Sequence, residues 1–454
     1  MSELISLNNI SKPKTEKCSS EELVFDRSIV HTSITEDYGL TCDDLFVQSI
    51  FKSLYLGGML IGSFLIGMLS DKFGRLNAMI LSIFLVGGSG VLMAFVKNRI
   101  IFGILRITCG MGGMGCYMVP AVIAAETTLP THKIITTTVP GIAFILGELI
   151  FTFQAYFIRD WLTLQLVAFL PMLLLLGLYF LVPESTRWLI ANDRLDEAKK
   201  NIQKRASMNK KIPVPEELLV GKVTEFAATT GSTKKSSLID LFKHRTILYR
   251  TLNMFLQWFS VTMVYYGLLF GSTSLYGDPY VNFTLVVLAE LPSMFLYLRL
   301  PHMYGRRNSL VASQTISAIC CIGGGLLIEN SDLATLQITL VMIGRLFGGF
   351  GFKLVYLYTS ELYPTDMRNT AVGTCSSIAR IAGVIAILME NLKEFWPPMS
   401  MVIFGTVSII AAVLAFKFPE TRNDKLPESI DEALKLGQNV RRTQFGLVKR
   451  KENA

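Results

Sequence analysis

The chain has 454 residues, of which 51% are hydrophobic and only 17% are charged, and its mean hydropathy is +0.45. Soluble domains carry about 25% charged residues, so this composition excludes an ordinary soluble fold. The net charge is +8, but the bases gather in a few loops between apolar segments, which argues against a nucleic-acid partner. The four histidines are scattered and the cysteines lack metal-type spacing, so we expect no metal site and no cofactor.

A polar N-terminal segment, residues 1–45, precedes eleven apolar segments. Each apolar segment is long enough to cross the hydrocarbon core, which takes about 20 residues in a helix. Because lipid cannot satisfy backbone polar groups, such segments are expected to be helices. We therefore predict an all-α membrane protein with about eleven transmembrane helices. The segments are 46–69, 77–96, 100–125, 134–157, 161–182, 247–272, 280–299, 308–328, 332–358, 370–390 and 396–417.

Lysine and arginine are concentrated in every second loop. Cytoplasmic loops carry an excess of these bases, so the loops after the odd-numbered segments are predicted to be cytoplasmic and the N-terminus to lie outside. The polar stretch 183–246 then forms a cytoplasmic loop between an N-terminal bundle, 46–182, and a C-terminal bundle, 247–418. Residues 419–454 form a basic cytoplasmic tail, and residues 1–45 lie outside the membrane.

Three short patterns occur twice in the same order. "DKFGR" places Gly74 and "HMYGRR" places Gly305 at an offset of 231 residues (74 to 305). "ETTLPTHK" and "ELYPTDMR" recur at an offset of 235 (126 to 361), and "PEST" and "PET" at 236 (183 to 419). Each pattern lies at the predicted cytoplasmic end of a span. The recurrence of all three in the same order indicates that the chain has two similar halves. Parallel half-repeats around a site at the bilayer midplane are typical of one large group of secondary transporters.

The stretch "GMLSDKFGR" (67–75) resembles the loop signature of the major facilitator superfamily. "DYGLTCD" (37–43), "AYFIRDW" (155–161), "PESTRWLI" (183–190), "VYYGL" (264–268) and "ELYPTDMRNTAVGTCSSIARIAG" (361–383) are similar to the organic cation, organic anion and carnitine transporters of that superfamily. The resemblance implies a major facilitator fold of two pseudo-symmetric bundles. That family has twelve helices, so it also implies that this chain lacks the first one.

The resemblance further implies a cytoplasmic charge network that closes one gate during transport. The alternative is that these residues anchor helix ends at the membrane surface. At the position of Asp71 in the first half, the second half has His302, which predicts a weaker charge network in the second half. The expected network residues are Gly67, Asp71, Gly74, Arg75, Glu126, Lys133, Glu184, Arg187, Gly305, Arg306, Glu361, Arg368 and Glu420.

Ionisable residues inside membrane spans are costly and tend to be functional. Glu148, Glu290, Lys353 and Arg380 lie within spans, whereas Arg106 and Arg345 are expected closer to segment ends. Acid and base together suggest a substrate with both signs, and aromatic rings attract organic cations. The alternatives are structural ion pairs, such as Glu290 with Arg380, and simple packing of the aromatics. The candidate substrate-binding residues are Tyr117, Glu148, Trp258, Tyr265, Glu290, Lys353 and Arg380.

The predicted function is transport of small organic ions by alternating access, with an anion or zwitterion favoured. Its partners are a small organic ion and the lipid bilayer, the expected location is the plasma membrane, and coupling to an ion or proton stays open. One alternative is a non-transporting scaffold or truncated relative of such a carrier, and another is a sugar carrier of the same superfamily. The sequence has no nucleophile–base set and no nucleotide-binding loop, so we do not expect an enzyme.

Overall fold

The computed structural model describes residues 27, 30–41, 44–128, 133–208, 240–275, 277–328, 330–422, 424, 426, 427 and 430–436. In this part of the chain, ten helical stretches are long and apolar enough to cross a membrane, and α18 (Met399–Ala415) is a shorter apolar helix. The other long helices are α2 (Leu45–Phe73), α3 (Arg75–Met93), α4 (Arg99–Thr127), α5 (Lys133–Phe157), α6 (Trp161–Leu174), α12 (Arg245–Gly271), α13 (Pro279–Leu288), α14 (Glu290–Tyr304), α15 (Arg306–Leu326), α16 (Ala334–Leu362) and α17 (Thr365–Leu388).

Two of the predicted spans are not single uninterrupted α-helices. The fifth consists of α6, a 3₁₀ turn (Leu175–Gly177) and α7 (Leu178–Leu181), and together they cover Trp161–Leu181. The seventh consists of α13 and α14, which meet at Ala289 and together cover Pro279–Tyr304. Apolar periodicity does not reveal such breaks, because hydropathy stays high across them.

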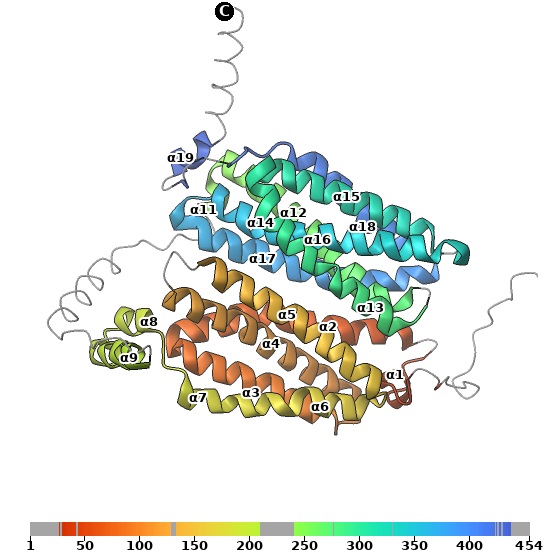
Figure 1. The fold of residues 1–454 in the computed structure, drawn as a ribbon, viewed down its shortest axis with the longest axis horizontal. Coiled ribbons are helices and arrows are strands. Elements are labelled where there is room, and N and C mark those ends of the chain that lie inside the picture. Colours follow the sequence, from red (N-terminus) through yellow and green to blue (C-terminus); the bar gives the residue numbers. More distant parts are fainter. Residues whose placement is uncertain are drawn as a thin grey trace, which may run out of the picture.

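The helices form two bundles that lie against each other along their length (Figure 1). In the first half, α4 packs between α2 and α3, and α6 covers α3. In the second half, α15 packs on α16 and α18, and α12 packs on α16 and α17. The halves meet where α2 packs on α17 and where α5 packs on α13 and α14. The outer face of α6 is apolar and exposed, as a lipid-facing helix requires.

The two ends of the bundles differ in what covers them. The short helices α8 (Thr186–Ala191), α9 (Leu195–Met208), α11 (Asp240–Lys243) and α19 (Ile430–Lys435) gather at one end, on the left of Figure 1. We call this the basic end, and it also carries the α2–α3 and α14–α15 turns. The opposite end carries α1 (Ile34–Asp37), and we call it the cap end.

Residues 30–41 close the cap end of the first half. Tyr38 packs against the rings of Phe51 and Phe102, and its O–H donates to the carbonyl of Val96. The Trp161 ring N–H donates to the Asp37 carboxylate over 2.7 Å. Hydrogen bonds from Thr163 and Thr32 lower the pKa of Asp160, which lies in the α5–α6 turn. This polar segment is therefore anchored on the bundle at several points.

The tight turns at the basic end both require glycine. Gly74 joins α2 to α3 at φ +103°, and Gly305 joins α14 to α15 at φ +89°. A Cβ atom at Gly74 would lie 2.3 Å from Glu184 Oε2, and one at Gly305 would lie 2.4 Å from Glu420 Oε2. Gly67 is different, because it is helical and its added Cβ would meet only Met118 Cε at 3.5 Å.

We expect Gly74→Ala and Gly305→Ala each to lower the melting temperature of the purified protein. The strained backbone alone costs on the order of 1–3 kcal/mol, and the clash displaces a carboxylate as well. Gly67→Ala is the matched control and should leave the melting temperature unchanged or slightly raised, since alanine favours helix. Equal melting temperatures for all three variants would contradict this account of the turns.

Candidate functional site

The carboxylate of Glu290, at the start of α14, is the centre of a buried ion cluster in the second half. Its Oε2 accepts hydrogen bonds from the Tyr265 hydroxyl and from Arg345 Nη2, both at 2.9 Å. Its Oε1 accepts from Lys353 Nζ at 3.0 Å. The side chain of Glu290 is 8% exposed and that of Arg345 is 0% exposed. One acid thus pairs with two bases inside the bundle, and the three groups together keep a net positive charge.

The helical repeat of α16 places both bases on this carboxylate. Arg345, Gly349 and Lys353 are four residues apart and share one face of the helix. Gly349 faces α14, since a Cβ there would lie 3.4 Å from Ser293 Oγ, an ordinary contact distance. Lys353 Nζ also donates to Ser293 Oγ at 3.0 Å. The Arg345 guanidinium lies 3.5 Å from the centroid of the Tyr265 ring, a cation–π contact.

One expectation and one alternative from the sequence are wrong here. Arg345 lies in the middle of α16 and is the most buried base of the cluster, not a residue near a segment end. Glu290 pairs with Arg345 and Lys353, and not with Arg380. The reason is the rotation of the helices about their axes. The face of α16 points at Glu290, whereas Arg380 on α17 reaches towards α4 instead.

Two ionisable side chains near the cluster, those of Glu148 and Arg380, form no ion pair with another described residue. Glu148 on α5 interacts electrostatically with Arg345, Glu290 and Lys353, yet its Oε2 is buried without a hydrogen-bond partner. Arg380 on α17 donates to the Ser376 carbonyl and hydroxyl and, at 3.3 Å, to the sulfur of Met114 on α4. A thioether is a weak acceptor, so this contact hardly offsets the charge.

The aromatic candidates divide into two groups. Trp258 is 0% exposed, its ring N–H donates to Thr359 Oγ1, and it packs inside the second half. Tyr265 is engaged by Glu290 and Arg345. Tyr117 on α4, in contrast, is 53% exposed and lies within electrostatic range of Arg380.

Tyr266 on α12 lies within electrostatic range of both Glu148 and Arg380. It was not among the residues expected to bind substrate. The only sequence signal for it was its position beside Tyr265 in "VYYGL".

The ion cluster is not a product of the internal duplication. At the offsets of the repeat, Met59 occupies the place of Glu290, Gly110 that of Arg345 and Met118 that of Lys353. The first half therefore has no equivalent charges at these positions, and the cluster is a feature of the second half.

The basic end, in contrast, carries the same charge network in both halves. In the first half, Arg75 binds the carboxylates of Asp71 at 2.5 Å and Glu126 at 3.1 Å. Glu184 accepts the backbone N–H groups of Arg75 and Leu76, each at 3.0 Å. The carboxylate thus holds the first turn of α3, where free N–H groups favour an anion.

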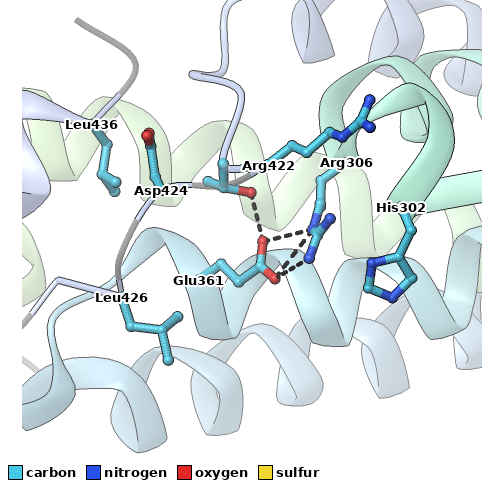
Figure 2. Close-up of a pocket in the computed structure, with 8 residues that line it drawn as sticks. His302, Arg306, Glu361, Arg422, Asp424, Leu426 and Leu436 are labelled. Atoms are coloured by element: carbon cyan, nitrogen blue, oxygen red, sulfur yellow. Dashed lines mark hydrogen bonds and ion pairs between the residues drawn. The ribbon is translucent and has the colours of Figure 1, made fainter. Parts of the chain in front are cut away.

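In the second half, Arg306 binds both oxygens of Glu361 at 3.0–3.2 Å, and Figure 2 shows the two groups facing each other. Glu420 accepts the backbone N–H groups of Arg306 at 2.7 Å and Arg307 at 3.1 Å. Where Arg75 binds Asp71, Arg306 instead donates to the carbonyl of Pro301, because His302 replaces the aspartate.

The remaining expected network residues are less clearly engaged. Lys133 begins α5, but its side chain lies outside the described residues. Arg187 is exposed on α8. Arg368 has buried Nε and Nη2 atoms without a hydrogen-bond partner in the described part of the chain.

Each of these two networks lies within one half, and other polar contacts tie the halves together. Lys52 on α2 pairs with Glu390, after α17, at 3.7 Å. Ser49 Oγ donates to Asn391 Oδ1 at 2.8 Å. Both contacts lie towards the cap end, so in this conformation polar contacts close that end. Sequence reasoning missed these four residues, which lie near span ends where no pattern distinguishes them.

A model of the family described as "Sugar (and other) transporter" matches residues 11–433. The chain belongs to this family. It is a multi-pass membrane protein of a transporter family, and its relatives are organic cation and carnitine transporters, as the sequence motifs indicated.

Among the relatives of this transporter, an organic cation transporter protein of Drosophila melanogaster is 32% identical over 94% of the chain and 78% of the relative. Mouse solute carrier family 22 member 3 is 32% identical over 90% of the chain and 73% of the relative. Mouse organic cation/carnitine transporter 2 is also 32% identical, over 91% and 73%.

Solved structures confirm the predicted major facilitator fold. The xylose transporter XylE from E. coli, in an inward-open conformation, matches this transporter with a TM-score of 0.67. The match is 19% identical and covers 84% of this chain and 88% of XylE. The likeness at this level of identity concerns the fold.

We expect Glu290→Gln to destabilise the transporter far more than Glu148→Gln. Removing one partner of a buried ion pair costs about 3–5 kcal/mol, because the bases are left uncompensated. Glu148 Oε2 has no hydrogen-bond partner, so its amide should be tolerated with a change below about 1 kcal/mol. Thermal unfolding of the purified variants in one detergent checks the order, and equal melting temperatures would contradict it.

Proposed function

We propose that this transporter carries small organic zwitterions, with Glu148 and Arg380 as the groups that recognise the two charges. The observation that carries the proposal is that neither side chain belongs to an ion pair of the described residues, although both lie in the interior. Desolvated charges without partners are costly, so they persist where a ligand supplies the partner.

Glu290 is a poor candidate for direct contact with a cationic substrate. Three donors already occupy its oxygens, and two of them are cations. A substrate cation would have to displace one of these bases. The proposed role of Glu290 and Lys353 is therefore to set the local potential and to hold α14 against α16.

The two charges that lack an ion-pair partner among the described residues lie on different halves. Glu148 is on α5 and Arg380 is on α17, and Tyr266 interacts with both. A guanidinium binds a carboxylate through two parallel hydrogen bonds, which suits Arg380 for the anionic group. A carboxylate beside an aromatic ring suits an ammonium group. A zwitterion would therefore bridge the two bundles.

Alternating access fits the placement of the polar contacts. Residues 46–182 and 247–418 act as the two moving bodies, joined by the cytoplasmic loop 183–246 and followed by the tail 419–454. The pairs Lys52–Glu390 and Ser49–Asn391 hold the cap end closed, and they must break for the site to open outwards. The networks around Arg75 and Arg306 are proposed to form the gate at the basic end, which we assign to the cytoplasmic side of the plasma membrane.

A neutral sugar is the weaker alternative. The family model includes sugar carriers, and XylE is a xylose transporter. A sugar would, however, supply no charge to either Glu148 or Arg380, whereas two relatives are named for organic cations and carnitine. Charge complementarity therefore favours an organic ion.

Uptake into cells that express the chain tests the proposal with four labelled probes: carnitine, a quaternary amine, an organic carboxylate and xylose. We expect saturable uptake of carnitine that falls about tenfold or more with either Arg380→Gln or Glu148→Gln, since a charge-assisted hydrogen bond contributes about 1.5–3 kcal/mol. Arg380→Gln should selectively reduce uptake of the organic carboxylate. Glu148→Gln should selectively reduce uptake of the quaternary amine.

Lys200→Gln on the exposed face of α9 is the control and should leave uptake unchanged. Surface labelling must show equal amounts of each variant. Uptake of xylose alone would favour the sugar carrier, and surface expression without uptake of any probe would favour the non-transporting scaffold.

A further inference from the structure

A second group of positive charges lies far from the ion cluster, around a pocket at the basic end of the second half. Among the described residues, five bases line this pocket, and Glu420 is the one acid that lines it. The oxygens of Glu420 are already used, because they accept backbone N–H groups of Arg306, Arg307, Thr421 and Arg422. The five bases are Arg245, Arg250, Arg307, Lys417 and Arg422.

In the part of the chain that the structure describes, the side-chain hydrogen bonds that these bases donate go to neutral oxygens. Arg250 donates to the carbonyl of Ala433, Arg422 to the carbonyl of Met303, and Lys417 to the hydroxyl of Tyr249. Neutral oxygens orient the cations but do not neutralise them. The described residues that line the pocket therefore carry an excess of positive charge.

The duplication does not account for two of these charges. At the repeat offsets of 231 and 236 residues, Arg307 corresponds to Leu76 and Lys417 to Leu181. The first half makes the same turn and the same carboxylate cap with apolar or neutral residues at these positions. The bases are therefore not needed to form the turn.

The pocket opens at the depth expected for lipid headgroups. Ile410, Val413 and Phe416 at the end of α18 are 50–60% exposed, as a lipid-facing surface would be, and Lys417 follows immediately. Tyr249 and Tyr304, which also line the pocket, are half exposed or more. Tyrosine beside bases is typical of the membrane–water interface.

We propose that this pocket binds the headgroup of a membrane phospholipid that carries more than one phosphate group. Five cations around one pocket exceed what a headgroup with a single negative charge would compensate. Guanidinium groups match phosphate oxygens in a bidentate geometry, and basic pockets on the cytoplasmic side bind such headgroups. The bound lipid would join the start of α12, the α14–α15 turn and α19, and so would stabilise the second half at its gate.

The purified full chain, reconstituted in phosphatidylcholine nanodiscs, tests this proposal. One set contains phosphatidylinositol bisphosphate and a second set contains phosphatidylserine at matched total charge. We expect the bisphosphate lipid to raise the melting temperature and to remain bound in native mass spectrometry, with a clear preference over phosphatidylserine.

The double variant Arg245→Gln/Lys417→Gln should weaken binding by about tenfold or more, since each base near an anionic surface contributes on the order of 1 kcal/mol. The matched control Lys200→Gln/Lys204→Gln removes two exposed bases of α9 and should change nothing. If the double variant does not fold, Lys417→Gln alone should show a smaller loss of the same kind.

Equal binding of phosphatidylserine at matched charge, or equal weakening by the α9 control, would overturn the proposal in favour of general surface charge. Soluble inositol trisphosphate distinguishes a membrane lipid from a free phosphate compound as the ligand of the pocket. Competition with the lipid supports headgroup recognition, whereas binding of the soluble phosphate without any lipid binding would contradict a membrane ligand. None of these outcomes depends on which solute is transported.

Discussion

The placement of one carboxylate determines much of the chemistry in the interior of this transporter. Glu290 pairs with Arg345, which has no exposed surface, and with Lys353 on the same face of α16. Burying two cations is tolerable only when an anion and further acceptors compensate them. The pairing joins α12, α14 and α16, and near it Glu148 and Arg380 stand outside the ion pairs of the described residues. The proposed recognition of the substrate depends on this difference: Glu290 already has ion-pair partners, whereas Glu148 and Arg380 do not.

The duplicated parts and the parts found in only one half have different roles. The glycine turns at Gly74 and Gly305, and the arginines and carboxylates beside them, recur because both bundles need the same turn and the same anion at a helix start. The ion cluster around Glu290 and the basic pocket around Lys417 occur where the first half has apolar or neutral residues. The repeated features therefore belong to the architecture shared by both halves, whereas the ion cluster and the basic pocket are specific to the second half.

Much of the fold was predictable because its determinants are local. Apolar runs predicted the spans, and "DKFGR" with "HMYGRR" predicted the turns at Gly74 and Gly305. The partner of Glu290 was not predictable, because it depends on how α14 and α16 are rotated about their axes. Lys52 and Glu390 were missed for a related reason, since their contact depends on how the two halves approach at the cap end.

A double-mutant cycle on Glu290 and Arg345 tests the central claim most directly. The melting temperatures of Glu290→Gln, Arg345→Met and the combined variant are measured in one detergent. If the carboxylate stabilises the fold by neutralising a buried base, the combined variant should be more stable than Glu290→Gln alone, because replacing a whole buried pair costs much less than breaking it. Strictly additive losses would show that the two charges act independently and would contradict the account.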